Sequence, residues 1–164
     1  MPDTTPTRIF SLDPKTKGFG YAVLELPFRL VEWGFARIGD DKHADAILAF
    51  EKLLTRFRPD AVVLEDAEAP GSRRQPRVRR LIDALVKIAR ERGIAVYTVA
   101  RSAVLTCFAP LEGRATKYSV AKSLTAAFPE LAEQLPPPRK LWQAEHERMS
   151  VFNALAFAMT HATA

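Results

Sequence analysis

The order of apolar and polar residues gives the chain a strand-rich beginning and a helix-rich remainder. At the beginning, apolar residues run together or alternate with polar ones, which is the pattern of strands buried on one or both faces. Glycine and proline residues between the runs indicate turns, and short connections favour antiparallel pairing. The runs predict an antiparallel meander of strands at residues 8–13, 19–25 and 30–36.

Further along the chain, apolar residues recur three and four positions apart, which predicts helices with one buried face. Two of these helices precede a short apolar run, and such a helix serves as a crossover between strands. The helices are predicted at 41–57, 81–93, 101–108, 116–128 and 147–162, and the two later strands at 61–65 and 94–99. A run of prolines at 136–138 interrupts the helical pattern and predicts a linker within the domain.

Two acidic residues stand at the ends of apolar runs. Asp13 closes the run at 8–13, and Glu65 closes the run at 61–65. A carboxylate where a buried strand emerges is costly to desolvate unless a positive charge compensates it, and a divalent cation between two strand ends would do so. A turn or capping role for Asp13 and a salt bridge for Glu65 would explain each residue alone. The pair, however, favours a metal site.

The length and composition fit a single globular domain over residues 1–164, with 48% hydrophobic and 26% charged residues. No apolar run approaches the roughly 20 residues that span a bilayer. The N-terminal residues lack the pattern of a signal peptide, so we expect a cytoplasmic protein without membrane contact. Cys107 is the single cysteine, which excludes an internal disulfide, and we expect it to be a small buried side chain.

Positive charge gathers in one short segment. The formal net charge is +5, and residues 72–80 contain five arginines, which are Arg73, Arg74, Arg77, Arg79 and Arg80. A solvated helix face is the usual meaning of such a run. Because this run follows Glu65 by only a few residues, it lies beside the expected metal site, and we interpret it as a segment that binds nucleic-acid phosphates.

The predicted order of elements is that of the RNase H-like fold, and three motifs resemble those of RuvC-type Holliday junction resolvases. The motifs are DPKTKGFGYAV at 13–23, FRPDAVVLE at 57–65 and ALAFAMTH at 154–161. The similarity extends over nearly the whole chain. It implies a single nuclease domain with an α/β fold, in which helices flank a mixed five-stranded sheet made of the antiparallel meander and parallel strands.

The resemblance implies two-metal hydrolysis of phosphodiester bonds, with Mg²⁺ or Mn²⁺ as the cofactor. Asp13 would bridge the ions, and Glu65 and an acid at position 153 would each hold one. In these resolvases the last helix supplies two acids three residues apart, and the matching positions here are Ser150 and Asn153. An asparagine offers a carbonyl oxygen to a cation but removes one negative charge, so we expect lower metal affinity and lower activity.

Three explanations of Asn153 are open. It is an engineered Asp→Asn substitution that allows binding without cutting, or Glu145 or Glu147 supplies the acid, or the chain is a binding-only relative. In a straight helix Glu145 would lie about 80° and Glu147 about 120° around from Asn153, so neither shares its face well. Glu145 would reach the catalytic cluster only if the chain enters the helix there. We favour the engineered substitution because the other motifs are intact.

The resemblance implies that the partner is branched DNA. Candidate DNA contacts are Lys15, Lys17, Arg73, Arg74, Arg77, Arg79, Arg80 and Lys117. The helix that Lys117 opens has N-terminal amides that could share one phosphate with it. We therefore predict a metal-dependent endodeoxyribonuclease that resolves four-way junctions as a homodimer, because a two-fold junction calls for two symmetric sites. The alternatives are a junction-binding protein without activity and a nuclease that cuts RNA–DNA hybrids.

Overall fold

The structure of the protein, a computed structural model, describes residues 7–39, 42–72, 74–111, 113–140, 142–143 and 145–164. The strands are β1 (Arg8–Lys15), β2 (Gly18–Glu25), β3 (Arg29–Arg37), β4 (Ala61–Glu65) and β5 (Ala95–Val99). The helices are α1 (Lys42–Phe57), α2 (Pro76–Glu91), α3 (Arg101–Cys107), α4 (Lys117–Ala127) and α5 (Met149–Thr163), with a 3₁₀ helix η1 (Pro129–Gln134). The strand order β3-β2-β1-β4-β5, antiparallel on one side of β1 and parallel on the other, confirms the predicted mixed sheet.

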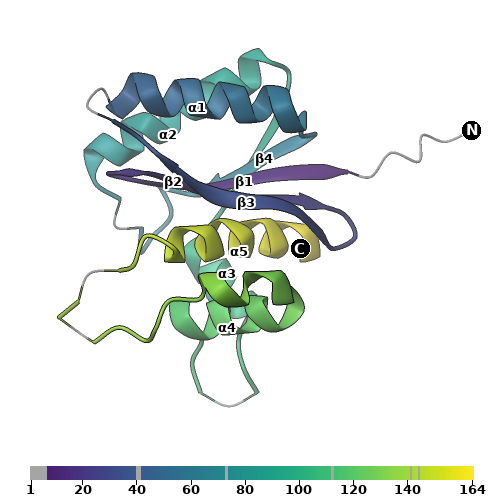
Figure 1. The fold of residues 1–164 in the computed structure, drawn as a ribbon, viewed down its shortest axis with the longest axis vertical. Helices are drawn as coiled ribbons and strands as arrows, with labels where there is room; N and C mark the ends of the chain where they lie inside the picture. Colours follow the sequence, from purple (N-terminus) through teal and green to yellow (C-terminus); the bar gives the residue numbers. More distant parts are fainter. Residues whose placement is uncertain (1–6, 40–41, 73, 112, 141, 144) are drawn as a thin grey trace, which may run out of the picture.

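Helices cover both faces of the sheet (Figure 1). The helices α1 and α2 lie on one face, whereas α5 lies against the other face with α3 and α4 beyond it. Successive residues of a strand point to opposite faces. Accordingly, Phe10 and Leu12 of β1 belong to the buried cluster beneath α1 and α2, and Ile9 belongs to the cluster around α5. The fold has three layers and two cores, one on each side of the sheet.

The helix α5 is buried on almost every side over residues 149–158, as expected for a helix that is apolar all round. Its start is fixed to the β1–β2 hairpin by Ser150. The Ser150 hydroxyl donates to the backbone oxygen of Asp13 at 2.8 Å and accepts from the backbone N–H of Gly20 at 2.9 Å. A Cβ atom at Gly20 would lie 2.4 Å from the Ser150 carbonyl carbon, so glycine allows this close approach.

Three details of the sequence prediction are wrong. The helix predicted at 81–93 begins at Pro76, where a proline suits the first position of a helix, so the end of the arginine segment is helical. The last helix begins at Met149 and not at 147, because the N–H groups of Met149 and Ser150 bond to carbonyls three residues back, in a turn. Cys107, expected to be buried, is exposed at the end of α3, where Val104 is the buried residue. Among the residues that the structure describes, no helix is long and apolar enough to cross a membrane.

Candidate active site

Asp13 and Glu65 lie side by side at one end of the sheet. The parallel pairing of β1 with β4 sets Ser11 opposite Val63, so the residues two positions further on are at the same level and on the same face. That face is the one that α5 covers. The residues are 0% and 3% exposed, so both carboxylates are removed from water. The strand alternation therefore brings the two acids together beneath the start of α5.

The guanidinium group of Arg74 lies between these two carboxylates. It donates to Oδ1 of Asp13 and to Oε2 of Glu65, and another of its N–H groups reaches the backbone oxygen of Pro14 at 2.5 Å. The Arg74 side chain is only 8% exposed. We expected this residue to contact DNA, but the structure places its charge inside the acidic pair.

Asn153 faces Asp13 from the beginning of α5. Its amide nitrogen Nδ2 donates to Oδ2 of Asp13 at 3.0 Å. Ser150 is at the other position matched to an acid, and its hydroxyl is hydrogen-bonded to the backbone of the β1–β2 hairpin. Glu147 bonds to Arg37 of β3 at 2.6 Å and does not turn to the pair. Neither position on α5 that matches a resolvase acid therefore brings a negative charge to Asp13.

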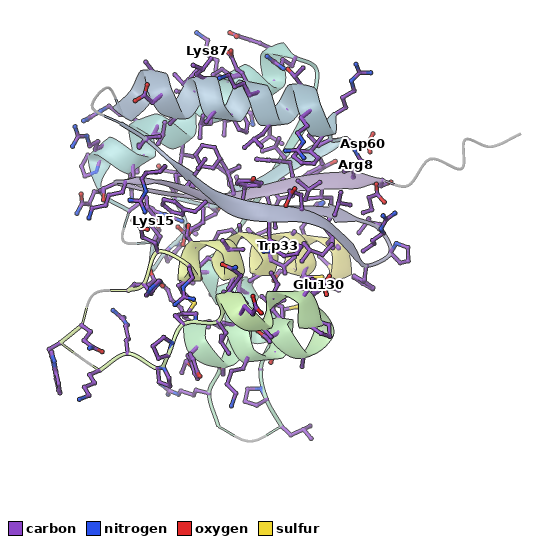
Figure 2. All side chains as sticks on the ribbon, in the orientation of Figure 1. Arg8, Lys15, Trp33, Asp60, Lys87 and Glu130 are labelled. Carbon is purple, nitrogen blue, oxygen red and sulfur yellow. The ribbon has the colours of Figure 1, made fainter. Side chains whose placement is uncertain are left out.

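Lys15, Lys117 and Glu145 form an outer cluster next to the acidic pair. Lys15 Nζ lies 3.1 Å from one Glu145 oxygen and 3.5 Å from Oδ2 of Asp13, and Lys117 Nζ lies 3.1 Å from the other Glu145 oxygen. Figure 2 shows Lys15 at the end of the sheet opposite Arg8. Glu145 precedes α5, so the path of the chain into the helix sets its direction. Its carboxylate is linked to the pair through Lys15.

Arg101 is a residue of the site that the sequence analysis missed. Its Nε donates to Oε1 of Glu65 at 3.1 Å, and its guanidinium carbon lies 5.5 Å from the centre of the Phe157 ring. Arg101 is the first residue of α3, directly after β5, which is parallel to β4. A basic residue just past a third parallel strand was the available signal, because the ends of parallel neighbours meet at one edge of the sheet.

Burial and charge act against each other at these groups. Burial opposes ionisation of Asp13, but Arg74 and Lys15 outweigh it and hold the pKa of this carboxyl well below its usual range. Burial disfavours the charged form of Arg74 as well, yet the two carboxylates raise its pKa. For Glu145 the two lysines overcome burial and lower the pKa, whereas burial lowers the pKa of Lys117 despite Glu145.

Three of the predicted DNA-binding side chains lie exposed near this end of the sheet. Lys17 is in the β1–β2 turn, and Arg77 and Arg80 are at the start of α2. Arg77 lines a small crevice together with Lys15 and Thr16, so the turn and the helix are neighbours. These residues define a surface, here called the basic rim, that borders the acidic pair: Lys15, Lys17, Arg77 and Arg80.

The arginine segment at 72–80 is not one continuous surface. Arg74 points inward, and Arg79 pairs with Glu68 at 3.5 Å. Arg73 lies outside the described residues. The charge run therefore divides into an inward arginine, a paired arginine and the exposed part that belongs to the basic rim.

With Arg74 between the two acids, no oxygen of the pair is free for a divalent cation. Each oxygen of Asp13 and each oxygen of Glu65 accepts a hydrogen bond from a side-chain nitrogen, so the four ligand atoms face N–H groups. Within the described ranges of the chain, no group of three or more His, Cys, Asp and Glu side chains is placed to hold a metal ion. Positive groups of the protein itself stand where the ion was expected.

Comparison with protein-family models gives no match for this chain, and comparison with curated protein sequences gives none. Solved structures do match. RuvC of T. thermophilus in complex with a Holliday junction substrate has a TM-score of 0.69 at 22% identity, over 95% of this chain and 92% of that chain. A second T. thermophilus RuvC structure gives 0.69 and 22%, over 95% and 93%. The yeast mitochondrial Holliday junction resolvase gives 0.52 and 14%, over 98% and 81%.

At these identities the likeness concerns the fold. It covers nearly the whole length of the chain and of the T. thermophilus structures, so the shared part is the complete sheet with its helices. The resemblance expected from the three motifs is thereby confirmed in three dimensions: the chain has the RNase H-like fold in the form found in RuvC Holliday junction resolvases.

Proposed function

We propose that this protein is a RuvC-type, structure-specific endodeoxyribonuclease that binds four-way DNA junctions. The observation that supports the proposal most directly is the pairing of buried Asp13 and Glu65 at one sheet end, in a fold that matches RuvC solved with a junction. Isolated acids are rarely buried together unless a site requires them. The location matches the one that the motifs implied.

The basic rim supports DNA as the ligand. Lys17, Arg77 and Arg80 are exposed beside the acidic pair, and exposed cations bind a phosphate backbone largely through charge. Lys117 is the first residue of α4, and the amides of a helix N-terminus favour a phosphate, as its ammonium group does. We include a homodimer in the proposal, because a two-fold junction presents two equivalent strands to cut. Sedimentation of the protein with and without junction DNA tests that part.

Two residues of this chain, Asn153 and Arg74, act against cleavage. We propose dependence on Mg²⁺ or Mn²⁺ through Asp13 and Glu65, with Glu145 and position 153 as candidates for the remaining acid. Asn153 supplies no charge, and Arg74 occupies both carboxylates. These two observations favour, as a second candidate function, junction binding without cutting.

A binding and cleavage assay tests both functions. The substrates are a four-way junction, a linear duplex of the same sequence and an RNA–DNA hybrid, and the proteins are this chain and Asn153→Asp, with Mn²⁺. We expect both proteins to bind the junction more tightly than the duplex, and the acid-restored variant to cut the junction faster. Equal affinity for junction and duplex would contradict junction recognition. If both proteins bind the junction and neither cuts it, cleavage is refuted and only the junction-binding function stands.

A further inference from the structure

The contacts of Arg74 reproduce what a bridging cation would do. A guanidinium group is planar and presents several N–H donors in one plane, which suits it to two acceptors at once. Here it bridges Oδ1 of Asp13 and Oε2 of Glu65, and its remaining bond to Pro14 fixes it against β1. It therefore holds together two carboxylates that would repel each other at this distance in a dry interior.

The negative charges of the pair are already more than compensated without an ion. Two carboxylates contact three positive side chains, which are Arg74, Arg101 and Lys15. A divalent ion added to this set would bring two further positive charges into a buried space. Removing Arg74 would instead leave the acids with fewer positive contacts and with two oxygens free to coordinate.

Arg74 belongs to a connecting segment and not to the rigid elements. β4 ends at Glu65 and α2 begins at Pro76. The chain between them forms turns, in which hydrogen bonds join residues that are close in sequence, such as Ala69 N–H to the Asp66 carbonyl at 3.3 Å. Gly71 in this connection has a φ of +89°, and nothing lies within 4 Å of its Cβ position. The residue that carries the guanidinium group is therefore outside the strands and the helix that hold Asp13, Glu65 and Asn153.

We infer that the guanidinium group of Arg74 and a divalent cation are alternative occupants of the Asp13–Glu65 pair, so that a metal binds only when Arg74 leaves. The inference rests on the proposed function in one respect: it takes this pair as the metal site of the nuclease. It adds that the chain carries its own competitor for the metal, within the segment that also supplies the basic rim.

Calorimetric titration with Mn²⁺, in the absence of DNA, tests the inference. The proteins are Asn153→Asp and the double variant Asn153→Asp/Arg74→Ala. We expect the double variant to bind Mn²⁺ at least about tenfold more tightly, because one competing charge at contact distance has gone. Mn²⁺ should also raise the melting temperature of the double variant more than that of Asn153→Asp, since a ligand stabilises the state that binds it.

Asn153→Asp/Arg90→Ala is the matched control. It removes the same charge, but Arg90 is exposed in the last turn of α2, far from the acidic pair, so its Mn²⁺ affinity should equal that of Asn153→Asp. Arg74→Lys in the acid-restored protein covers the case in which the alanine variant does not fold. A single ammonium group cannot bond both carboxylates and Pro14, so we expect affinity between those of the other two proteins.

Equal Mn²⁺ affinity with and without the Arg74 guanidinium, or no Mn²⁺ binding by the folded Arg74 variants, would overturn the inference. Junction binding by Asn153→Asp is measured separately. If that protein prefers the junction and only the Mn²⁺ result fails, the competition by Arg74 is refuted and the proposed function stands. If it shows no preference for the junction, the proposed function fails whatever the metal titration gives.

Discussion

A carboxylate with no exposed surface is unstable in a protein interior unless positive groups and hydrogen-bond donors surround it. Asp13 meets this condition through the guanidinium group of Arg74, the ammonium group of Lys15 and the amide of Asn153. The same groups occupy its oxygens. The arrangement that makes Asp13 stable in this state also makes it a poor metal ligand.

Asp13→Asn is expected to destabilise the protein by about 3–5 kcal/mol at neutral pH, because it leaves Arg74 buried with one carboxylate. The surrounding positive charges lower the pKa of Asp13, so its stabilising effect is present above the unfolded value of about 3.9 and is lost as the pH falls through the folded value. The stability difference between protein and variant should therefore narrow below about pH 4. Denaturant unfolding at pH 7 and at pH 3 measures it.

Asp83→Asn provides the control for that comparison. Asp83 is exposed on α2, so its substitution should change the free energy of unfolding little at either pH. If Asp13→Asn lowers the free energy of unfolding at pH 7 no more than Asp83→Asn does, the buried ion pairs make no net contribution to stability.

Glu145→Gln tests the outer cluster. The substitution removes the acceptor that holds Lys15 and Lys117, so both lysines become available to phosphates. We expect tighter junction binding and a log–log salt slope steeper by up to about 0.9 for each lysine that gains a phosphate. Fluorescence anisotropy at several salt concentrations measures both.

Glu147→Gln is its matched control, because it removes the same charge but its partner is Arg37 on β3. Identical effects of the two variants would mean that overall charge, and not the outer cluster, sets the affinity. In the Asn153→Asp protein, loss of cutting on adding Glu145→Gln would identify Glu145 as a further acid of the nuclease.

At the level of strands and helices, the position of Asp13 and Glu65 at the ends of two apolar runs was enough to predict that they lie close together. The register that sets Ser11 opposite Val63 then places both on one face, and the sequence pattern does not give this register. The direction of Arg74 was beyond the sequence pattern, because a charge run predicts solvent exposure and nothing in its spacing selects one inward arginine. Glu145 was undecided for a related reason: helical periodicity says nothing of residues before the helix begins.

Gly20→Ala tests the contact that positions α5. The added Cβ would lie 2.4 Å from the Ser150 carbonyl carbon, so α5 must move away from the hairpin that carries Asp13. Overpacking of this kind costs about 1–3 kcal/mol, which unfolding by denaturant would detect. The nearest atom is backbone, so adding Ser150→Ala should not restore stability. Full recovery in the double variant would show that the side-chain hydroxyl, and not the helix backbone, is the obstacle.

Across the whole molecule, the positive charge that matters for DNA is a question of position and not of the net value of +5. The acidic pair, the outer cluster and the basic rim gather where β1 and β4 end, beside the starts of α2 and α5. The C-terminal turn of α2 leads instead to the start of β5, at the opposite end of the sheet. The two ends of α2 therefore both carry basic residues, one end close to the site and the other far from it.

That geometry gives the last prediction its internal control. Changing Lys17, Arg77 and Arg80 to alanine should weaken junction binding and flatten its salt dependence by about 0.9 in log–log slope for each phosphate that the variant no longer binds. Changing Lys87, Arg90 and Arg92, which are exposed near the far end of α2, removes the same charge but should leave the slope unchanged. Arg74 is excluded from both sets because its guanidinium group is buried with the acids. Equal slopes for the two triple variants would remove Lys17, Arg77 and Arg80 from the DNA-binding surface and leave Lys15 and Lys117 as the remaining candidates.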